Sequence, residues 1–346
     1  MVEQTDRRTF LAASGAVLTG TIAGCLGDDD GEYPSETHTI TIPYGPGGGF
    51  DSYARLTAEH LTDHLGTDVT AENIEGGGGV VATEDTWRAD LDGYTSQLLH
   101  TNTMIREQLI RDVEFDVPEF TYLAQTAVDS QSIAVSPDSD IETWDDFVSG
   151  LQAGDITLGA QGGPLNITTM NYLIPGVIGG EYTQEDVLDN VVYYEGTGEN
   201  MDGVLSGDVD TATANYWSLL GWVESDDIDI LMVHRMLDEA PLPELTPNAQ
   251  TLQTANVPNG EEIEALQADT RIYIAPPGLE DEYPDRTETL REAYYDTLQD
   301  DDFLEEADES DLPIEFLEAD EAQETAVQAA QQWEDNVDLL EDLADN

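Results

Sequence analysis

The sequence predicts a mixed α/β fold built as two lobes behind an N-terminal leader. Short strand patterns alternate with helical patterns from residue 37 onward, which is typical of α/β architecture with mainly parallel strands. Glycine-rich loops recur directly after the predicted strands. The chain has 346 residues, and about 310 remain after a leader and tether of 36, which is more than one hydrophobic core usually supports.

The leader spans residues 1–25. Arg7 and Arg8 precede an uncharged, mostly apolar run over 10–26, which is short for a membrane-spanning helix of about 20 apolar residues. The arginine pair resembles a twin-arginine export signal, and Ile22-Ala23-Gly24-Cys25 resembles a lipobox, in which Cys25 carries lipid after cleavage. A plain N-terminal membrane anchor with an incidental cysteine is the alternative. Residues 26–36 then predict an acidic, flexible tether.

The first lobe is predicted over residues 37–130. Its predicted elements are a strand at 39–42, a helix at 51–65 capped by Asp51 and ended by Gly66, a strand at 69–72, a helix ending near Ala89 and a strand at 94–100.

The second lobe is predicted over 131–270, and residues 271–346 are predicted to return to the first. The predicted elements are a strand from Ile133, a helix capped by Thr143, a strand at 156–160, a helix from Asn166, strands at 191–194, 211–214, 228–233 and 271–275, a helix at 199–206 closed by Gly207, and a C-terminal helix from Asp320.

The charge of the chain excludes several partners. Asp and Glu number 75 against 10 basic residues, all of them arginine, and the net charge is −65. Such a protein repels itself at low salt, whereas at 1 M salt the Debye length falls to about 3 Å, so the composition indicates a protein that works in molar salt. Without a basic patch, binding to nucleic acid or to anionic lipid is not expected.

The segment IPYGPGGGFDSYARL (residues 42–56) is the most informative one for function. A strand ends in a glycine-rich loop, and the loop leads into the N-terminus of a helix. Glycines allow backbone N–H groups to point into one concavity, and the helix N-terminus adds unpaired donors and a partial positive charge. This arrangement can hold an anion without a basic side chain. A loop that simply turns tightly is the alternative.

Three further loops follow predicted strands, at residues 73–79, 100–103 and 159–166. Ligands of open α/β sheets bind at the carboxyl ends of strands, so these loops are expected to converge on one cleft. The predicted ligand-binding residues are Tyr44, Gly47, Gly48, Gly49, Phe50, Gly78, Thr101, Asn102, Gly159, Gln161, Gly162, Gly163, Asn166, Tyr194 and Asn215.

These motifs, in this order, resemble the extracytoplasmic receptors of tripartite tricarboxylate transporters, also called Bug proteins. The resemblance rests on IPYGPGGGFDSYARL, ENIEGGGGVVAT, DGYT at 92–95, YEGTG at 194–198, LSGDVD at 205–210, IAPPG at 274–278 and the helix with Trp333. It implies a periplasmic-binding-protein-like fold of type II, whose two lobes close on a small carboxylate. It also implies delivery to a large and a small membrane subunit, with the receptor on the outer cell surface.

The sequence departs from the family pattern at two of these positions. Phe50 stands where a small polar residue is common, and Glu195 where a lysine is common. A ligand sensor of the same fold and a secreted α/β hydrolase remain as alternatives. The hydrolase would need a nucleophile and a base, and the chain has five histidines and one cysteine. His60 and His64 are spaced for zinc, but a solvated helix face is expected, so no metal and no cofactor are predicted.

Overall fold

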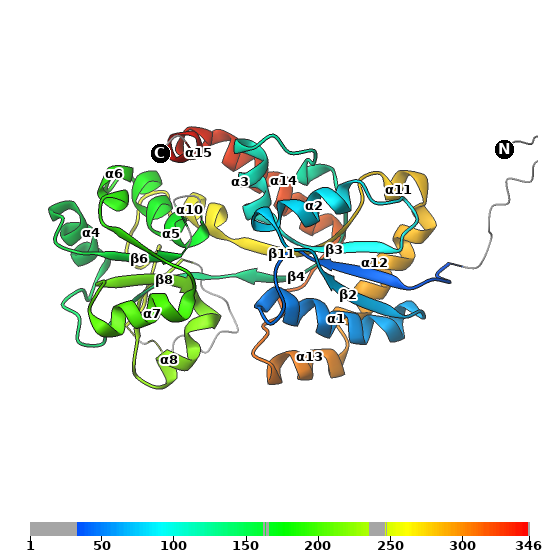
Figure 1. The fold of residues 1–346 in the computed structure, drawn as a ribbon, viewed down its shortest axis with the longest axis horizontal. Coiled ribbons are helices and arrows are strands. Elements are labelled where there is room, and N and C mark those ends of the chain that lie inside the picture. The colour runs from blue at the N-terminus through cyan, green and yellow to red at the C-terminus, as the bar shows by residue number, and fades with distance from the viewer. Residues whose placement is uncertain (1–32, 162, 164–165, 235–245, 247, 345–346) are drawn as a thin grey trace, which may run out of the picture. The chain divides into compact units, whose positions relative to one another are not determined.

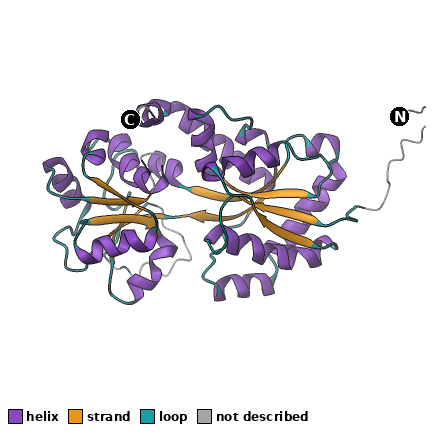
Figure 2. Ribbon diagram, in the orientation of Figure 1, coloured by secondary structure: helices purple, strands orange, loops and turns teal. Residues whose placement is uncertain are grey.

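The computed structural model describes residues 33–161, 163, 166–234, 246 and 248–344. Contacts between residues divide the chain into two units, residues 1–33 and residues 34–346. The predicted leader, with Cys25, and the predicted loop residue Gly162 lie outside the described residues. The second unit contains two six-stranded sheets, each flanked by helices (Figures 1 and 2).

The first sheet has the strand order β12-β4-β11-β3-β1-β2. Strand β1 pairs in parallel with β2 and β3, whereas β11 runs antiparallel to β3 and β4. The strands are β1 (His38–Ile42), β2 (Val69–Asn73), β3 (Thr95–His100), β4 (Thr121–Asp129), β11 (Asp269–Ala275) and β12 (Leu317–Glu318).

Helices lie on both faces of the first sheet (Figure 2). Helices α2, α3 and α14 are seen on one side of it, and α1, α12 and α13 on the other (Figure 1). The helices of this part are α1 (Gly49–Leu65), α2 (Val80–Trp87), α3 (Thr101–Ile110), α11 (Leu279–Glu282), α12 (Pro284–Leu298), α13 (Asp301–Glu309), α14 (Ala319–Asp335) and α15 (Val337–Ala344), with short 3-10 turns at Gly77–Gly79 and Val117–Glu119.

The second sheet has the order β10-β9-β5-β8-β6-β7. Its strands are β5 (Gln131–Val135), β6 (Leu158–Gln161), β7 (Val191–Tyr194), β8 (Thr211–Asn215), β9 (Asp229–Val233) and β10 (Gln250–Thr251). Its helices are α4 (Trp144–Ala153), α5 (Ile167–Leu173), α6 (Gln184–Leu188), α7 (Thr197–Ser206), α8 (Leu220–Glu224) and α10 (Gly260–Gln267), with a π-helical turn at Ile174–Ile178 and a 3-10 turn at Tyr216–Leu219.

The chain passes between the two sheets at two neighbouring places. Strand β4 of the first sheet ends at Asp129, and β5 of the second begins at Gln131. The return follows α10, where β11 begins at Asp269 and pairs with β4. The expectation of mainly parallel pairing holds for the pairs β1–β2, β1–β3, β6–β7, β6–β8 and β9–β10. It is wrong for the connecting strands β4, β5 and β11, which run antiparallel to their neighbours.

Most predicted helix boundaries are confirmed. Thr143 forms a capping box with Asp146, and Gly66 and Gly207 end their helices in the left-handed region. The predicted cap of α1 is wrong, because the N-cap is Gly48 and Asp51 lies inside the first turn. Helices α3, α10, α12 and α13 and strand β4 were not among the predicted elements.

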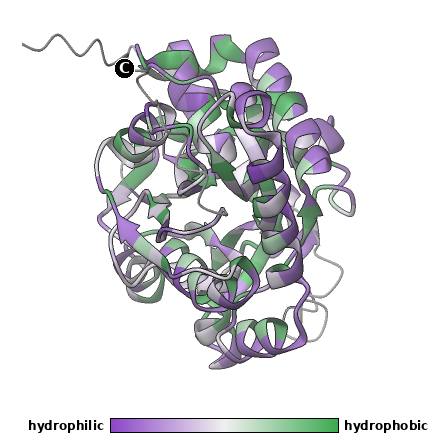
Figure 3. Ribbon diagram, turned by 90° about the vertical axis from the view of Figure 1, so that its right-hand side faces the viewer, coloured by the Kyte–Doolittle hydropathy of each residue, from purple (hydrophilic) through white to green (hydrophobic). Residues whose placement is uncertain are grey.

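Large apolar side chains fill the core between sheets and helices. Trp144, Phe147 and Tyr172 stack in the second part of the fold, and Trp333 is fully buried on α14. Figure 3 shows polar and apolar residues alternating along the helices, as expected for helices that cover a sheet with one face. No helix among the described residues is long and apolar enough to cross a membrane.

The pair His60 and His64 stands beside α13, with His60 half-buried and His64 exposed, so the helix face is solvated at His64, as expected, and partly covered at His60. His60 Nε2 lies 3.1 Å from Glu306, and His64 Nε2 lies 3.7 Å from Asp300. Among the residues that the structure covers, no group of His, Cys, Asp and Glu side chains is arranged to hold a metal ion.

Candidate ligand-binding site

The first glycine loop connects β1 to α1 and presents an uncapped helix N-terminus. Gly47, Gly48 and Gly49 are exposed, and Gly47 has a φ of 86°, which a residue with a side chain rarely adopts. In the described part of the chain no side chain caps α1, whose N-cap is Gly48. The first backbone N–H groups of this 17-residue helix are therefore available to an anion.

Asp51 holds the shape of this loop. Its carboxylate accepts hydrogen bonds from the Gly47 N–H (2.9 Å), from Arg55 Nε (2.9 Å) and from Asn73 Nδ2 (2.9 Å). The hydrogen bond from Arg55 is the main reason why the pKa of Asp51 is lowered to about 2. Asn73 also donates to the carbonyl of Tyr44 (2.9 Å), so it ties the end of β2 to the loop.

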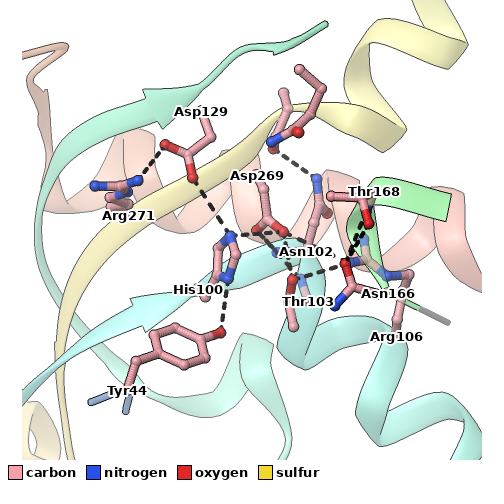
Figure 4. A network of polar contacts seen from close by, with 12 residues as sticks. Tyr44, His100, Asn102, Thr103, Arg106, Asp129, Asn166, Thr168, Asp269 and Arg271 are labelled. Atoms are coloured by element: carbon pink, nitrogen blue, oxygen red, sulfur yellow. Dashed lines mark hydrogen bonds and ion pairs between the residues drawn. The ribbon is translucent and has the colours of Figure 1, made fainter. Parts of the chain in front are cut away.

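Three rings lie together beneath the loop. Tyr44 Oη lies 2.9 Å from His100 Nδ1, at the end of β3 (Figure 4). The Phe50 ring lies 4.9 Å from that of Tyr44 and 4.8 Å from that of His100, centroid to centroid. A methyl carbon on Gly79, in the second glycine loop, would lie 3.5 Å from Tyr44 Oη. The first two glycine loops and the end of β3 are thus packed together, and their predicted convergence with the loop at 159–166 on one cleft stays a prediction.

A buried group of charged side chains continues from His100 (Figure 4). His100 Nε2 lies 3.0 Å from Asp269 and 3.7 Å from Asp129. Arg271 Nη2 lies 2.7 Å from Asp129, and Arg106 Nη2 lies 3.8 Å from Asp269. Burial lowers the pKa of His100, which favours its neutral form. We call these five residues the hinge charge cluster, because Asp129 and Asp269 stand where the chain passes between the sheets.

Asp269 occupies the N-terminus of α3. It accepts hydrogen bonds from the N–H groups of Asn102 (2.8 Å) and Thr103 (3.3 Å) and from Thr103 Oγ1 (2.7 Å). This is the arrangement expected for an anion at a helix N-terminus, supplied here by the chain itself.

Comparison with known protein families shows which family this chain belongs to. The model of the tripartite tricarboxylate transporter family receptor, TctC, matches residues 53–341. The chain belongs to this receptor family. It is a family of periplasmic solute-binding receptors and not of enzymes, as the motif order had indicated.

Named relatives agree with this assignment. The receptor is 28% identical over 214 residues to a UPF0065 protein of Agrobacterium vitis and 25% identical over 224 residues to BugT of Bordetella pertussis. These alignments cover 61% and 63% of this chain, and the chain spans 59% and 65% of the length of those two relatives.

The solved structures show the fold. A TctC solute-binding protein from Polaromonas aligns over 88% of this chain and 99% of its own, with a TM-score of 0.71 and 17% identity. MatC of Rhodopseudomonas palustris with bound malate aligns over 90% and 100%, with a TM-score of 0.63 and 19% identity. A second protein of R. palustris, with adipate, aligns over 89% and 98%, with a TM-score of 0.67 and 19% identity.

The predicted residues at the end of β3 are buried within the receptor. Thr101 and Asn102 are each 1% exposed. The Asn102 amide donates to the carbonyls of Ala265 (3.3 Å) and Ala268 (2.7 Å), so this side chain ties α3 to the segment before β11. Its role at a ligand stays a prediction.

The predicted residues in the second sheet form a separate polar group. Gln161 donates from Nε2 to Thr197 Oγ1 (2.8 Å), and its backbone N–H donates to Thr168 Oγ1 (2.8 Å). Asn166 is exposed and caps α5 by accepting from the Thr168 N–H (3.0 Å). Gly163 lies beside them, with open space around its Cα. Gln161, Gly163 and Asn166 therefore stand together at the carboxyl end of β6.

The other three predicted residues of this half have local packing roles. A methyl carbon on Gly159 would lie 2.2 Å from Asn200 Oδ1, so this glycine permits α7 to approach β6. A methyl carbon on Gly203 of α7 would lie 2.4 Å from Tyr194 Oη, so Tyr194 packs against this glycine. Asn215 accepts from the Trp217 N–H (3.0 Å) at the end of β8. Gly78 is exposed in the second glycine loop.

Sequence reasoning did not select the hinge charge cluster. Asp129, Asp269, Arg106 and Arg271 were not predicted as site residues, and His100 entered only as part of a loop. One signal was present: in a chain with ten arginines, Arg106 and Arg271 stand within apolar segments, MIREQLI and RIYIA. A charged residue in such a segment is buried only if it is paired.

Proposed function

We propose that this receptor captures a small carboxylate, either a di- or tricarboxylate or a related organic acid, and delivers it to the large and small membrane subunits of a tripartite tricarboxylate transporter. The observation that carries the proposal is the uncapped N-terminus of α1 behind the exposed residues Gly47–Gly49. Such an end binds a carboxylate through backbone N–H groups. Malate and adipate, bound by two proteins of the same fold, support the choice of ligand class.

The proposed site combines the first glycine loop with the polar group at the end of β6. Backbone donors explain how an acidic receptor can hold an anion. Molar salt screens the surface charges beyond about 3 Å, whereas charge-assisted hydrogen bonds act at contact and contribute about 1.5–3 kcal/mol each.

Titration calorimetry in molar salt against a panel of carboxylates tests the proposal. The variant Gly48→Val removes room for a ligand at the loop. Gly48 has a φ of −91°, and a methyl carbon there would meet only the Gly45 carbonyl at 3.9 Å, so the fold accommodates the change. We expect at least about a tenfold loss of affinity, because charge-assisted hydrogen bonds are lost.

Gly221→Val is the matched control, because Gly221 is exposed in α8 and has open space around its Cα. It should bind as the parent does. A parent protein that binds no member of the panel would disprove the proposal, and a folded Gly48→Val variant with parental affinity would move the site elsewhere.

We also propose that the receptor is exported by the twin-arginine route and anchored to the cell surface by lipid on Cys25, with residues 26–36 as the tether. The arginine pair and the sequence Ile22-Ala23-Gly24-Cys25 support this. Intact mass of the membrane-extracted protein tests it. We expect loss of residues 1–24 and a lipid on Cys25, and release or lack of processing after Cys25→Ser. An unmodified Cys25 with residues 1–24 retained would exclude this anchoring.

A further inference from the structure

Arg271 lies directly behind the first glycine loop. A methyl carbon built on Gly49 would be 3.2 Å from Arg271 Nη1 and 3.5 Å from Nη2. The guanidinium carbon lies 4.7 Å from the ring centroid of Phe50 and 4.6 Å from that of Tyr53. Gly49, Phe50 and Tyr53 all belong to the first turns of α1, so the helix itself positions this charge at its N-terminal end.

The guanidinium of Arg271 pairs with an acid through Nη2, while Nη1 is the nitrogen nearer to Gly49. Asp129 is its ion-pair partner, at 2.7 Å from Nη2. Asp129 also lies 3.7 Å from Nε2 of the neutral His100. Arg271 is 9% exposed, and its Nε has no hydrogen-bond partner among the described residues. A buried positive charge of this kind acts strongly on a nearby anion, because the local dielectric constant is low.

The N-terminus of the neighbouring helix α3 already holds a carboxylate. At its N-terminus the carboxylate of Asp269 accepts from two backbone N–H groups, and Arg106 lies 3.8 Å from that carboxylate. At the N-terminus of α1 the helix end and the arginine are present, but no side-chain carboxylate caps it. A carboxylate from a ligand would therefore complete at α1 the arrangement that Asp269 completes at α3.

We propose that Arg271 is a specificity-determining residue that gives the first glycine loop its preference for anionic ligands, and that Asp129 moderates this preference. This inference rests on the proposed function, since it assigns the charge selectivity of the same site. Arg271 acts through space on the ligand at α1, and Asp129 reduces its effective charge. Molar salt does not remove the effect, because Arg271 is buried and mobile ions do not reach it.

The test exploits the fact that Arg271 and Asp129 form one ion pair. Structural damage from breaking the pair would weaken binding whichever partner is removed. The proposed charge effect instead has opposite signs: Arg271→Gln weakens the binding of adipate about tenfold or more, and Asp129→Asn strengthens it severalfold, because the remaining charge is positive. Arg271→Lys keeps the charge and should bind adipate within about threefold of the parent.

Calorimetry with adipate in molar salt, alongside thermal melting of each variant, is the measurement. Arg88→Gln is the matched control, because Arg88 is a surface arginine that pairs with Glu84 and Glu114. It should leave the affinity unchanged. If Arg271→Gln does not fold, Asp129→Asn and Arg271→Lys still decide.

Weaker adipate binding by folded Asp129→Asn, or parental binding by folded Arg271→Gln, would overturn the inference while leaving the proposed function intact. A parent receptor that binds neither adipate nor any other carboxylate of the panel would instead end the proposed function, and this inference with it.

Discussion

Asp129 and Asp269 lie directly opposite each other in the antiparallel pairing of β4 and β11. Two acids in facing positions of a sheet ordinarily repel each other. Here each acid has its own arginine, Arg271 for Asp129 and Arg106 for Asp269, and Nε2 of the neutral His100 lies 3.0 Å from Asp269 and 3.7 Å from Asp129. The repulsion is thereby offset at the place where the chain passes between the sheets.

Replacing Asp269 by Asn is expected to destabilise the receptor by about 3 kcal/mol, because it removes one partner of a buried charge cluster. Asp269 is fully buried, and its carboxylate accepts from Asn102, Thr103 and the Thr103 hydroxyl. Chemical denaturation at constant molar salt gives the free energy of unfolding. Asp296→Asn, at an exposed position of α12, is the control and should change it by less than about 0.5 kcal/mol. Equal effects of the two substitutions would contradict this account.

The melting temperature of the receptor is expected to rise with salt. With a net charge of −65, self-repulsion destabilises the compact state unless ions screen it. Differential scanning calorimetry from about 0.2 M to about 4 M salt, where the Debye length falls from about 7 Å to below 3 Å, measures this. Sucrose, which stabilises folded proteins by exclusion from their surface without screening charge, shows how much of a rise is not due to screening. A melting temperature that stays constant across the range would refute adaptation to molar salt.

His38 is expected to make the stability fall below neutral pH. The ring is fully buried, with Nδ1 3.1 Å from the Gly93 carbonyl and Nε2 2.8 Å from Ser96 Oγ. Because a carbonyl only accepts, Nδ1 carries the proton and Nε2 accepts from Ser96, which suits the neutral ring. Burial lowers the pKa of His38 from 6.5 to about 4.

The unfolded chain therefore binds a proton at higher pH than the folded receptor does. The contribution of His38 is fully present above pH 6.5 and is lost as the pH falls towards about 4, with an upper bound of roughly 3 kcal/mol. In His38→Gln the free energy of unfolding should depend less steeply on pH in this window. His60→Gln, on the surface of α1, is the control. Parallel pH curves for His38→Gln and the parent would show that His38 does not titrate as described.

Two glycines of the same predicted loop are expected to respond differently to alanine. At Gly159 a methyl carbon would lie 2.2 Å from Asn200 Oδ1 and 3.2 Å from the Thr211 carbonyl, whereas at Gly163 it would have open space. Gly159→Ala should destabilise the receptor by about 1–3 kcal/mol, as overpacking commonly does, and Gly163→Ala should leave the melting temperature nearly unchanged. Thermal melting of both variants decides, and similar melting temperatures would mean that α7 does not approach β6 as closely as described.

Local patterns predicted the elements that depend on neighbouring residues. The alternation of residues 39–42, the cap at Thr143 and the glycines after α1 and α7 are properties of short segments, and they are confirmed. The cap of α1 was wrong because Asp51 was assigned from its residue type alone. In the fold the Asp51 carboxylate accepts hydrogen bonds from Gly47, four residues earlier in the chain, and from Asn73 at the end of β2. Asn73 is brought close to Asp51 by the pairing of β2 with β1.

The sequence by itself determined the family, the alternation of strands and helices around the glycine loops, the extreme acidity and the glycine loop in front of α1. Only the tertiary structure decided that Arg271 stands behind Gly49, and that Asp269 occupies the N-terminus of α3 while α1 is left uncapped. The physical reason is that a charge is buried only where distant segments supply its partners. Arg271 meets Asp129 through the pairing of β11 with β4 and meets Gly49 where α1 packs beside β11, in both cases across more than a hundred residues, and no short pattern records which segments will meet.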